Sequence, residues 1–280
     1  MTPDVWLQRH PYLGDVARFA FWVDGAVARL RVAEVPIPAF GDHAGDFQTG
    51  IPLVQSSTTH VDLEPAGAMA VSVARSLAED PLEGRTGDET RALDRELRED
   101  PEAPRRIAGW LLGDDAWTPA SPGLLRYLGW TAAARYLRPL VAEFSAWRDE
   151  DREERWQRAY CPTCGSAPAM AQLAGKDPGR RRLLCCGCCR TRWQFPRTAC
   201  PFCEADAQRL TSLTIEGEGG LRLDHCPSCG GYLKTYDGEG DEALLLADWS
   251  SLHLDVLALD RGWKRAAASL YELPAETANV

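Results

Sequence analysis

Eight of the ten cysteines in this chain fall into four pairs, and each pair has two residues between its cysteines. A pair with this spacing can direct both sulfur atoms at one metal ion, and four thiolates complete a tetrahedral site. The sequence therefore predicts two four-thiolate metal sites. The eight predicted ligands are Cys161, Cys164, Cys186, Cys189, Cys200, Cys203, Cys226 and Cys229.

The cysteine pairs form an internal repeat. The first pair recurs 39 residues later as the third pair, and the second recurs 40 residues later as the fourth. Each unit consists of a cysteine turn, about twenty residues and a second cysteine turn, which is the layout of a zinc ribbon or rubredoxin-like module. The repeat favours one ion in each unit over a cross-braced arrangement that pairs the first turn with the third.

The second turn of the first unit can be interpreted in two ways, because residues 185–189 read Cys-Cys-Gly-Cys-Cys. Alignment of the two units matches residues 182–186 with residues 222–226. It also places the apolar Trp193 and Leu233 each four residues beyond the last ligand. We therefore predict that the later cysteine of each doublet is the ligand.

The earlier cysteines of the doublets, Cys185 and Cys188, are not among the eight predicted ligands. Beside two ligand thiolates they could be redox-active or carry sulfur, but a free cysteine is more often a small buried apolar side chain. His225 lies next to Cys226 and could replace a ligand. Four cysteines already fill that site, so a flanking role is the better interpretation.

A four-thiolate site is usually structural, because sulfur fills every coordination position and no water can be activated. Ion binding could then stabilise each small module by ~10 kcal/mol or more. Thiolates suit both zinc and a rubredoxin-type single iron. The predicted cofactors are therefore two metal ions, iron or zinc, with one in each four-cysteine site.

Composition bears on the compartment and on the partner. The first four residues lack the basic start of a secretory leader and no apolar stretch approaches eighteen residues, so we expect a cytoplasmic protein with reduced cysteines and no stable membrane insertion. Net charge is −10, but residues 160–236 hold ten Lys/Arg against six Asp/Glu. Two divalent ions on eight thiolates would bring that region near neutrality. This argues against nucleic-acid binding, although the arginines of residues 180–197 could still form a local basic patch.

The rest of the chain predicts mostly helices. Apolar spacing indicates one helix after an N-cap at Asp15, a second over residues 66–77, and a third from Ser121-Pro122 to Pro139. A last helix over residues 243–259 is expected to pack back on these. Residues 38–65 predict an irregular crossing, and residues 80–106 a solvated loop with a short polar helix at 90–98.

These elements predict an α+β protein in four parts. No Walker loop, dinucleotide fingerprint or H-E-x-x-H spacing occurs, and the Gly-rich residues 217–220 are expected to form a turn, so no enzyme class is indicated. The five dispersed histidines receive no role. The predicted parts are a helical domain (1–158), two rubredoxin-like metal modules (159–198 and 199–240), and a C-terminal helix and tail (241–280).

Several motifs together resemble one known family. Gly-Ile-Pro-Leu occurs at 50–53, Cys-Pro-Thr-Cys-Gly-Ser-Ala-Pro at 161–168, Trp193 after the second pair, and Cys-x-x-Cys-Gly-Gly-Tyr-Leu-Lys at 226–234. In this order they resemble the formate dehydrogenase accessory protein family, FdhE, from about His10 to Trp263. Two features depart from the family pattern: Cys185 and Cys188 are additional, and the tail after Trp263 lacks the usual ending.

The resemblance implies a cytoplasmic maturation factor. Members of the family are needed for the activity of an exported, membrane-associated formate dehydrogenase without being part of it, and the family's metal ligands map onto the same eight cysteines. The implied partner is the catalytic subunit of that enzyme, held before export. Bound iron would add one-electron chemistry. Two other classes stay open: a nucleic-acid-binding zinc ribbon, and a thiol-based sulfur or redox carrier that uses Cys185 or Cys188.

Overall fold

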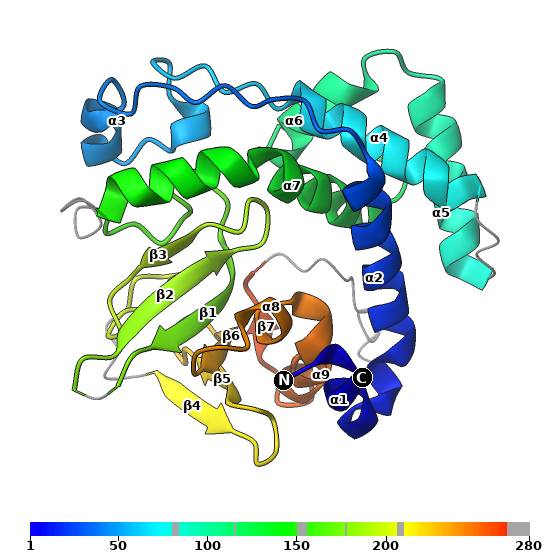
Figure 1. Cartoon of the computed structure of the whole chain (residues 1–280). Helices are drawn as coiled ribbons and strands as arrows, with labels where there is room; N and C mark the ends of the chain where they lie inside the picture. The colour runs from blue at the N-terminus through cyan, green and yellow to red at the C-terminus, as the bar shows by residue number, and fades with distance from the viewer. Residues whose placement is uncertain (80–83, 115, 150–155, 177, 206–209, 268–280) are drawn as a thin grey trace.

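The computed structural model describes residues 1–79, 84–114, 116–149, 156–176, 178–205 and 210–267. A helical half, formed by the N-terminal part of the chain, lies against a mixed β-sheet, and the C-terminal helices lie between the sheet and helix α2 (Figure 1). This arrangement confirms the expected α+β class. None of the described helices is both long and apolar enough to cross a bilayer.

Helix α2 (Gly14–Arg29) forms where the apolar spacing predicts it. Its buried face includes Ala20, Val23 and Val27. The predicted N-cap is wrong, because Asp15 lies in the first turn and not before it. A 3-10 turn (Pro11–Leu13) runs directly into α2, so the helix starts without a side-chain cap.

Helix α7 (Pro122–Asp149) starts as predicted but does not end at Pro139. Proline inside a helix removes one backbone hydrogen bond, at a cost of about 3 kcal/mol or more. Here Pro139 is exposed, while Leu137, Leu140 and Phe144 on either side of it are fully buried. Packing of these side chains outweighs the lost hydrogen bond, and the helix continues.

Three helices pack beside α7, namely α4 (Glu64–Glu79), α5 (Gly84–Arg98) and α6 (Ala103–Leu111). Helix α4 confirms the prediction at 66–77. The predicted solvated loop is wrong over the described residues from 84 to 106, because Leu93, Leu97 and Ala103 are buried in the core. The predicted polar helix at 90–98 is the second half of α5.

Residues 38–65 form the expected irregular crossing. It contains only a short helix α3 (Ala44–Thr49) and a 3-10 turn (Leu53–Gln55). At the start of the chain, helix α1 (Pro3–Arg9) is capped by Thr2, whose hydroxyl accepts a hydrogen bond from the Val5 backbone N–H. Figure 1 shows the crossing above α7 and α1 beside the C-terminal helices.

Both cysteine units contribute three antiparallel strands to one sheet. The strand order is β3-β2-β1-β6-β5-β4, and the short β7 pairs with β6. Strands β1 and β6 are parallel and join the units, with Met170 opposite Lys234. The division into two modules therefore stays a prediction, since their strands share hydrogen bonds. The strands are β1 (Pro168–Ala174), β2 (Arg181–Cys186), β3 (Arg192–Gln194), β4 (Thr211–Thr214), β5 (Leu221–His225), β6 (Gly231–Asp237) and β7 (Lys264–Arg265).

The predicted helix at 243–259 is broken into three pieces. They are helix α8 (Glu242–Leu245), a 3-10 turn (Asp248–Ser251) and helix α9 (Leu252–Leu259). The break occurs where Asp248 turns inward and the Ser250 hydroxyl donates to the Leu244 carbonyl at 2.8 Å. The pieces pack back on the N-terminal helices as expected: the Trp6 indole N–H donates to the Ser250 carbonyl at 3.0 Å.

A buried ion network explains why Asp248 turns inward. The Lys234 ammonium on β6 lies 2.6 Å from Asp248 and 2.8 Å from Asp255. The Arg265 guanidinium on β7 pairs with the same two carboxylates, and the Tyr232 hydroxyl donates to Asp255 at 2.7 Å. Burial alone would raise the pKa of Asp248, but Lys234 and Arg265 hold it well below its usual value. The network ties the sheet to α9.

Replacement of Lys234 by methionine should destabilise the fold by roughly 3 kcal/mol, because one cation of a buried, hydrogen-bonded network is removed and two carboxylates stay behind. The free energy of unfolding in urea measures the loss. Lys176→Met is the control, since Lys176 is exposed in the connection between β1 and β2. Equal stability of the two variants would contradict the role given to the network.

Candidate metal centres

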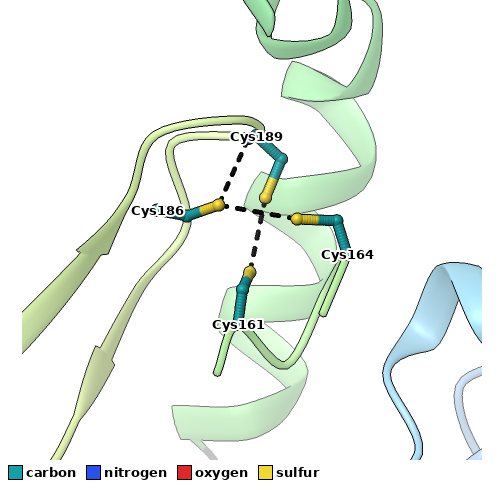
Figure 2. Close-up of side chains that lie close together, drawn as sticks. All are labelled: Cys161, Cys164, Cys186 and Cys189. Atoms are coloured by element: carbon teal, nitrogen blue, oxygen red, sulfur yellow. Dashed lines mark hydrogen bonds between the residues drawn. The ribbon is translucent and has the colours of Figure 1, made fainter. Parts of the chain in front are cut away.

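The first cysteine cluster lies between two turns at one end of the sheet. Cys161 and Cys164 come from the turn before β1, and Cys186 and Cys189 from the turn that links β2 to β3. Their sulfur atoms converge (Figure 2), with separations of 3.5 Å between Cys161 and Cys189 and between Cys164 and Cys186. All four side chains are buried.

The second cluster repeats this arrangement in a more open setting. The sulfur atoms of Cys200 and Cys229 are 3.9 Å apart, and those of Cys203 and Cys226 are 3.8 Å apart. Four sulfurs at about 2.3 Å from one Zn²⁺ would lie about 3.8 Å from each other, so both clusters have nearly the required dimensions. Cys203 is exposed and Cys229 is half-buried.

All four cysteine turns share one backbone conformation. In each, the first cysteine's N–H donates to a carbonyl five residues on, as Cys161 does to Ser166 at 2.9 Å. The residue after the second cysteine has a positive φ in every turn, which glycine adopts without strain. The four residues are Gly165, Arg190, Glu204 and Gly230, with φ of 81°, 64°, 56° and 70°.

The irregular crossing covers the first cluster. The backbone N–H groups of Leu53 and Val54 donate to the carbonyls of Pro162 and Thr163 at 2.9 and 2.8 Å. A Cβ atom at Gly165 would lie 2.5 Å from the amide nitrogen of Gln55, so a larger residue there would displace the end of the Gln55 side chain. These contacts connect the Gly-Ile-Pro-Leu motif to the first cysteine turn and shield its sulfurs from solvent.

Two threonines near the first cluster were missed by the sequence analysis. The hydroxyls of Thr163 and Thr191 are 2.8 Å apart, and Thr191 is also 3.1 Å from the Cys189 sulfur. Both are buried. They orient the Cys189 side chain, as outer-shell groups would at a metal site. Their places inside and just after the cysteine pairs are the only sequence signal that could have indicated them.

The thiols of the first cluster cannot all ionise together without a cation. Burial raises the pKa of Cys161, but hydrogen bonds from the other three thiols outweigh it and bring that pKa well below its usual value. Burial, together with hydrogen bonding to Cys161, raises the pKa values of Cys186 and Cys189 well above the usual value. The cluster by itself favours a single thiolate, whereas a divalent ion would allow four.

The structure groups the eight predicted cysteines by neighbouring turns and leaves Cys185 and Cys188 outside both clusters. All ten cysteines are free thiols, so no disulfide forms. Cys185 and Cys188 are buried, and burial raises the pKa of Cys185 to about 12. Either cluster could hold a metal ion; that the eight thiols ligate one stays a prediction.

This chain is similar in sequence and in structure to known proteins. No model of a known protein family matches it. The FdhE homologue of Pseudomonas aeruginosa is 36% identical over 131 residues, which cover 43% of this chain and 42% of that protein. FdhE of Escherichia coli is 30% identical over 122 residues, which cover 43% of this chain and 40% of that protein. The crystal structure of the FdhE protein from Pseudomonas aeruginosa matches with a TM-score of 0.62.

The chain is related to the FdhE family. The structural match covers 94% of this chain and 89% of the FdhE crystal structure's chain, at 23% sequence identity, so the likeness in fold extends over nearly the whole molecule. The sequence matches span less than half the length of the curated FdhE relatives. The resemblance carried by the sequence motifs is thus confirmed, and the α+β fold agrees with that of FdhE.

The two clusters should release metal at different rates. In zinc-loaded protein, a colorimetric chelator should remove the ion from the cluster with the exposed Cys203 roughly 10-fold or more faster than from the first cluster. A 10-fold difference in rate requires a free energy of local opening that is lower by only about 1.4 kcal/mol. Cys203→Ser should remove the fast phase, and Cys164→Ser the slow phase. Release in a single phase, or the reverse assignment, would contradict the difference in exposure.

Native metal-loaded protein should resist alkylation at Cys185 and Cys188, because both thiols are buried and neither reaches solvent. Peptide mass spectrometry after iodoacetamide treatment measures the modification at each site. The control is the same protein unfolded in the presence of a chelator, in which all ten cysteines should react. Rapid labelling of either residue in the native protein would revive the thiol-carrier interpretation.

Proposed function

We propose that this protein is an accessory factor for a formate dehydrogenase: it binds the catalytic subunit in the cytoplasm and is needed for that enzyme's activity. The observation that carries the proposal is the presence of two four-thiolate clusters in a chain related to FdhE proteins, whose fold it matches over 94% of its length. Each cluster holds one iron or zinc ion, ligated by its four cysteines.

A binding role fits the clusters better than a catalytic one. Sulfur fills all four positions of each predicted site, which leaves no position for a substrate or an activated water. The metal ions therefore act first on folding, because each joins two turns that otherwise have little core of their own. This supports a non-enzymatic role for the protein.

Three of the six arginines in residues 180–197 argue against the nucleic-acid alternative. Arg182 is buried and donates to the Ala199 carbonyl at 3.0 Å. Arg180 is paired with Asp237, and Arg192 donates to the Gln172 side chain at 2.7 Å. These guanidinium groups support the sheet and its connections, whereas a nucleic-acid-binding face needs arginines turned toward phosphates.

The second cluster is the better candidate for contact with the partner. Cys203 is exposed and Cys229 half-buried, so a docked protein could approach these sulfurs, whereas the irregular crossing covers the first cluster. With iron bound there, an electron could pass between the cluster and a metal or sulfur centre of the partner. With zinc bound, the same surface would serve docking alone.

The test is an affinity pull-down from anaerobically grown cells of the source organism, combined with metal analysis of the purified protein. Wild-type protein and Cys185→Ala should recover the formate dehydrogenase catalytic subunit and carry two metal ions. Cys203→Ser should carry one ion and recover less of the subunit, because the predicted docking face loses its fourth ligand. Recovery of nucleic acid in place of the subunit would overturn the proposal.

A further inference from the structure

Three residues from distant parts of the chain meet beside the second cysteine unit. His10 follows α1, Glu218 lies in the turn between β4 and β5, and His253 lies on α9. One ligand atom from each lies within 4.8 Å of the other two. From the sequence alone, no role is predicted for the dispersed histidines, and only a turn is predicted for residues 217–220, which include Glu218.

The surroundings of His10 determine which of its ring nitrogens carries hydrogen. Its Nδ1 is 3.0 Å from the Trp6 backbone carbonyl, which can only accept, so Nδ1 is the protonated nitrogen of the neutral ring. The Nε2 lone pair then faces the Glu218 carboxylate, whose oxygens lie 3.2 and 3.3 Å away. Two acceptors at this distance repel each other unless a cation or a proton lies between them.

His253 completes the cluster on its other side. Its Nε2 is 2.7 Å from a Glu218 oxygen, and within the described part of the chain its buried Nδ1 has no hydrogen-bond partner. The side chains of His10, Glu218 and His253 are only 5%, 12% and 12% exposed.

Aromatic rings pack against both imidazoles, and the nearby Arg9 donates to a backbone carbonyl. The Tyr12 ring lies edge-on to both imidazoles, with centroids 5.8 Å away from each. Arg9 is held on the outside of the turn, where it donates to the Gly217 carbonyl at 2.7 Å. The Trp6 ring stacks on His10 at 3.9 Å and fixes the orientation of the imidazole.

We propose that His10, Glu218 and His253 form a third metal site, which binds a divalent ion of the zinc class and joins the N-terminal segment and α9 to the second cysteine unit. Two imidazoles and one carboxylate are a known ligand set for zinc and leave a fourth position open. The hydrogen bond from His10 Nδ1 to a backbone carbonyl is the usual outer-shell contact of a metal-bound histidine. The site is chemically distinct from both four-cysteine clusters, because it contains no sulfur.

Cobalt titration of zinc-loaded protein tests this site. With the thiolates already occupied by zinc, Co²⁺ should bind as one further equivalent and give visible d–d absorption without thiolate-to-cobalt charge transfer. Binding should weaken as the solution is made acidic, because protons compete with the metal for both imidazoles. Zinc added afterwards should displace the cobalt and remove the absorption.

Glu218→Gln and His253→Gln should each weaken cobalt binding by about 100-fold or more, since outer-shell changes alone cost 10–100-fold at metal sites. Both keep side-chain length and hydrogen-bonding ability, and circular dichroism checks that the fold is retained. His60→Asn is the matched control: His60 is exposed and has a φ of 48°, which asparagine accepts. No saturable extra cobalt, equal binding by folded Glu218→Gln protein, or thiolate charge transfer would overturn the proposal.

Discussion

Four thiols confined within 4.8 Å of one another can be ionised together only if a cation lies among them, and two such groups organise the second half of this chain. Each group comes from two turns with the same backbone conformation, in which the residue after the second cysteine has a positive φ. A bound ion would therefore join the two turns of each group.

The two cysteine units are linked to each other and to the remaining chain by polar contacts as well as by core packing. Parallel pairing of β1 with β6 joins their strands into one sheet. The buried network around Lys234 then fixes β6 and β7 to α9, and the Trp6 indole continues the connection to α1. Because these contacts are shared, disturbance of one unit is expected to reach the other and the N-terminal helices.

The two clusters differ in what covers them, although their sequences are similar. The backbone of Leu53 and Val54 is hydrogen-bonded to the first cysteine turn, and the Gln55 side chain lies against Gly165. In the second unit, Cys203 reaches solvent. The first cluster is therefore protected from solvent, and the second is accessible to it.

Spacing within the sequence was sufficient to predict the cysteine turns and helices, because these depend on residues that are close together in the chain. The repeat indicated which cysteines group together, and alignment of the residues that flank them in the two units indicated which member of each doublet belongs. Apolar periodicity likewise located α2 and α4, whose buried faces follow from helical geometry. The motif resemblance to FdhE came from the same local patterns.

Tertiary packing determined the features that depend on residues far apart in the chain. Helix α7 passes through Pro139 because buried neighbours hold it, and the predicted helix at 243–259 breaks because Asp248 is drawn to Lys234. The approach of His10 and His253 to Glu218 also had no local signal, since more than 200 residues separate the first from the other two. Such contacts are set by the balance of burial and charge across the folded molecule, which the order of residues does not reveal.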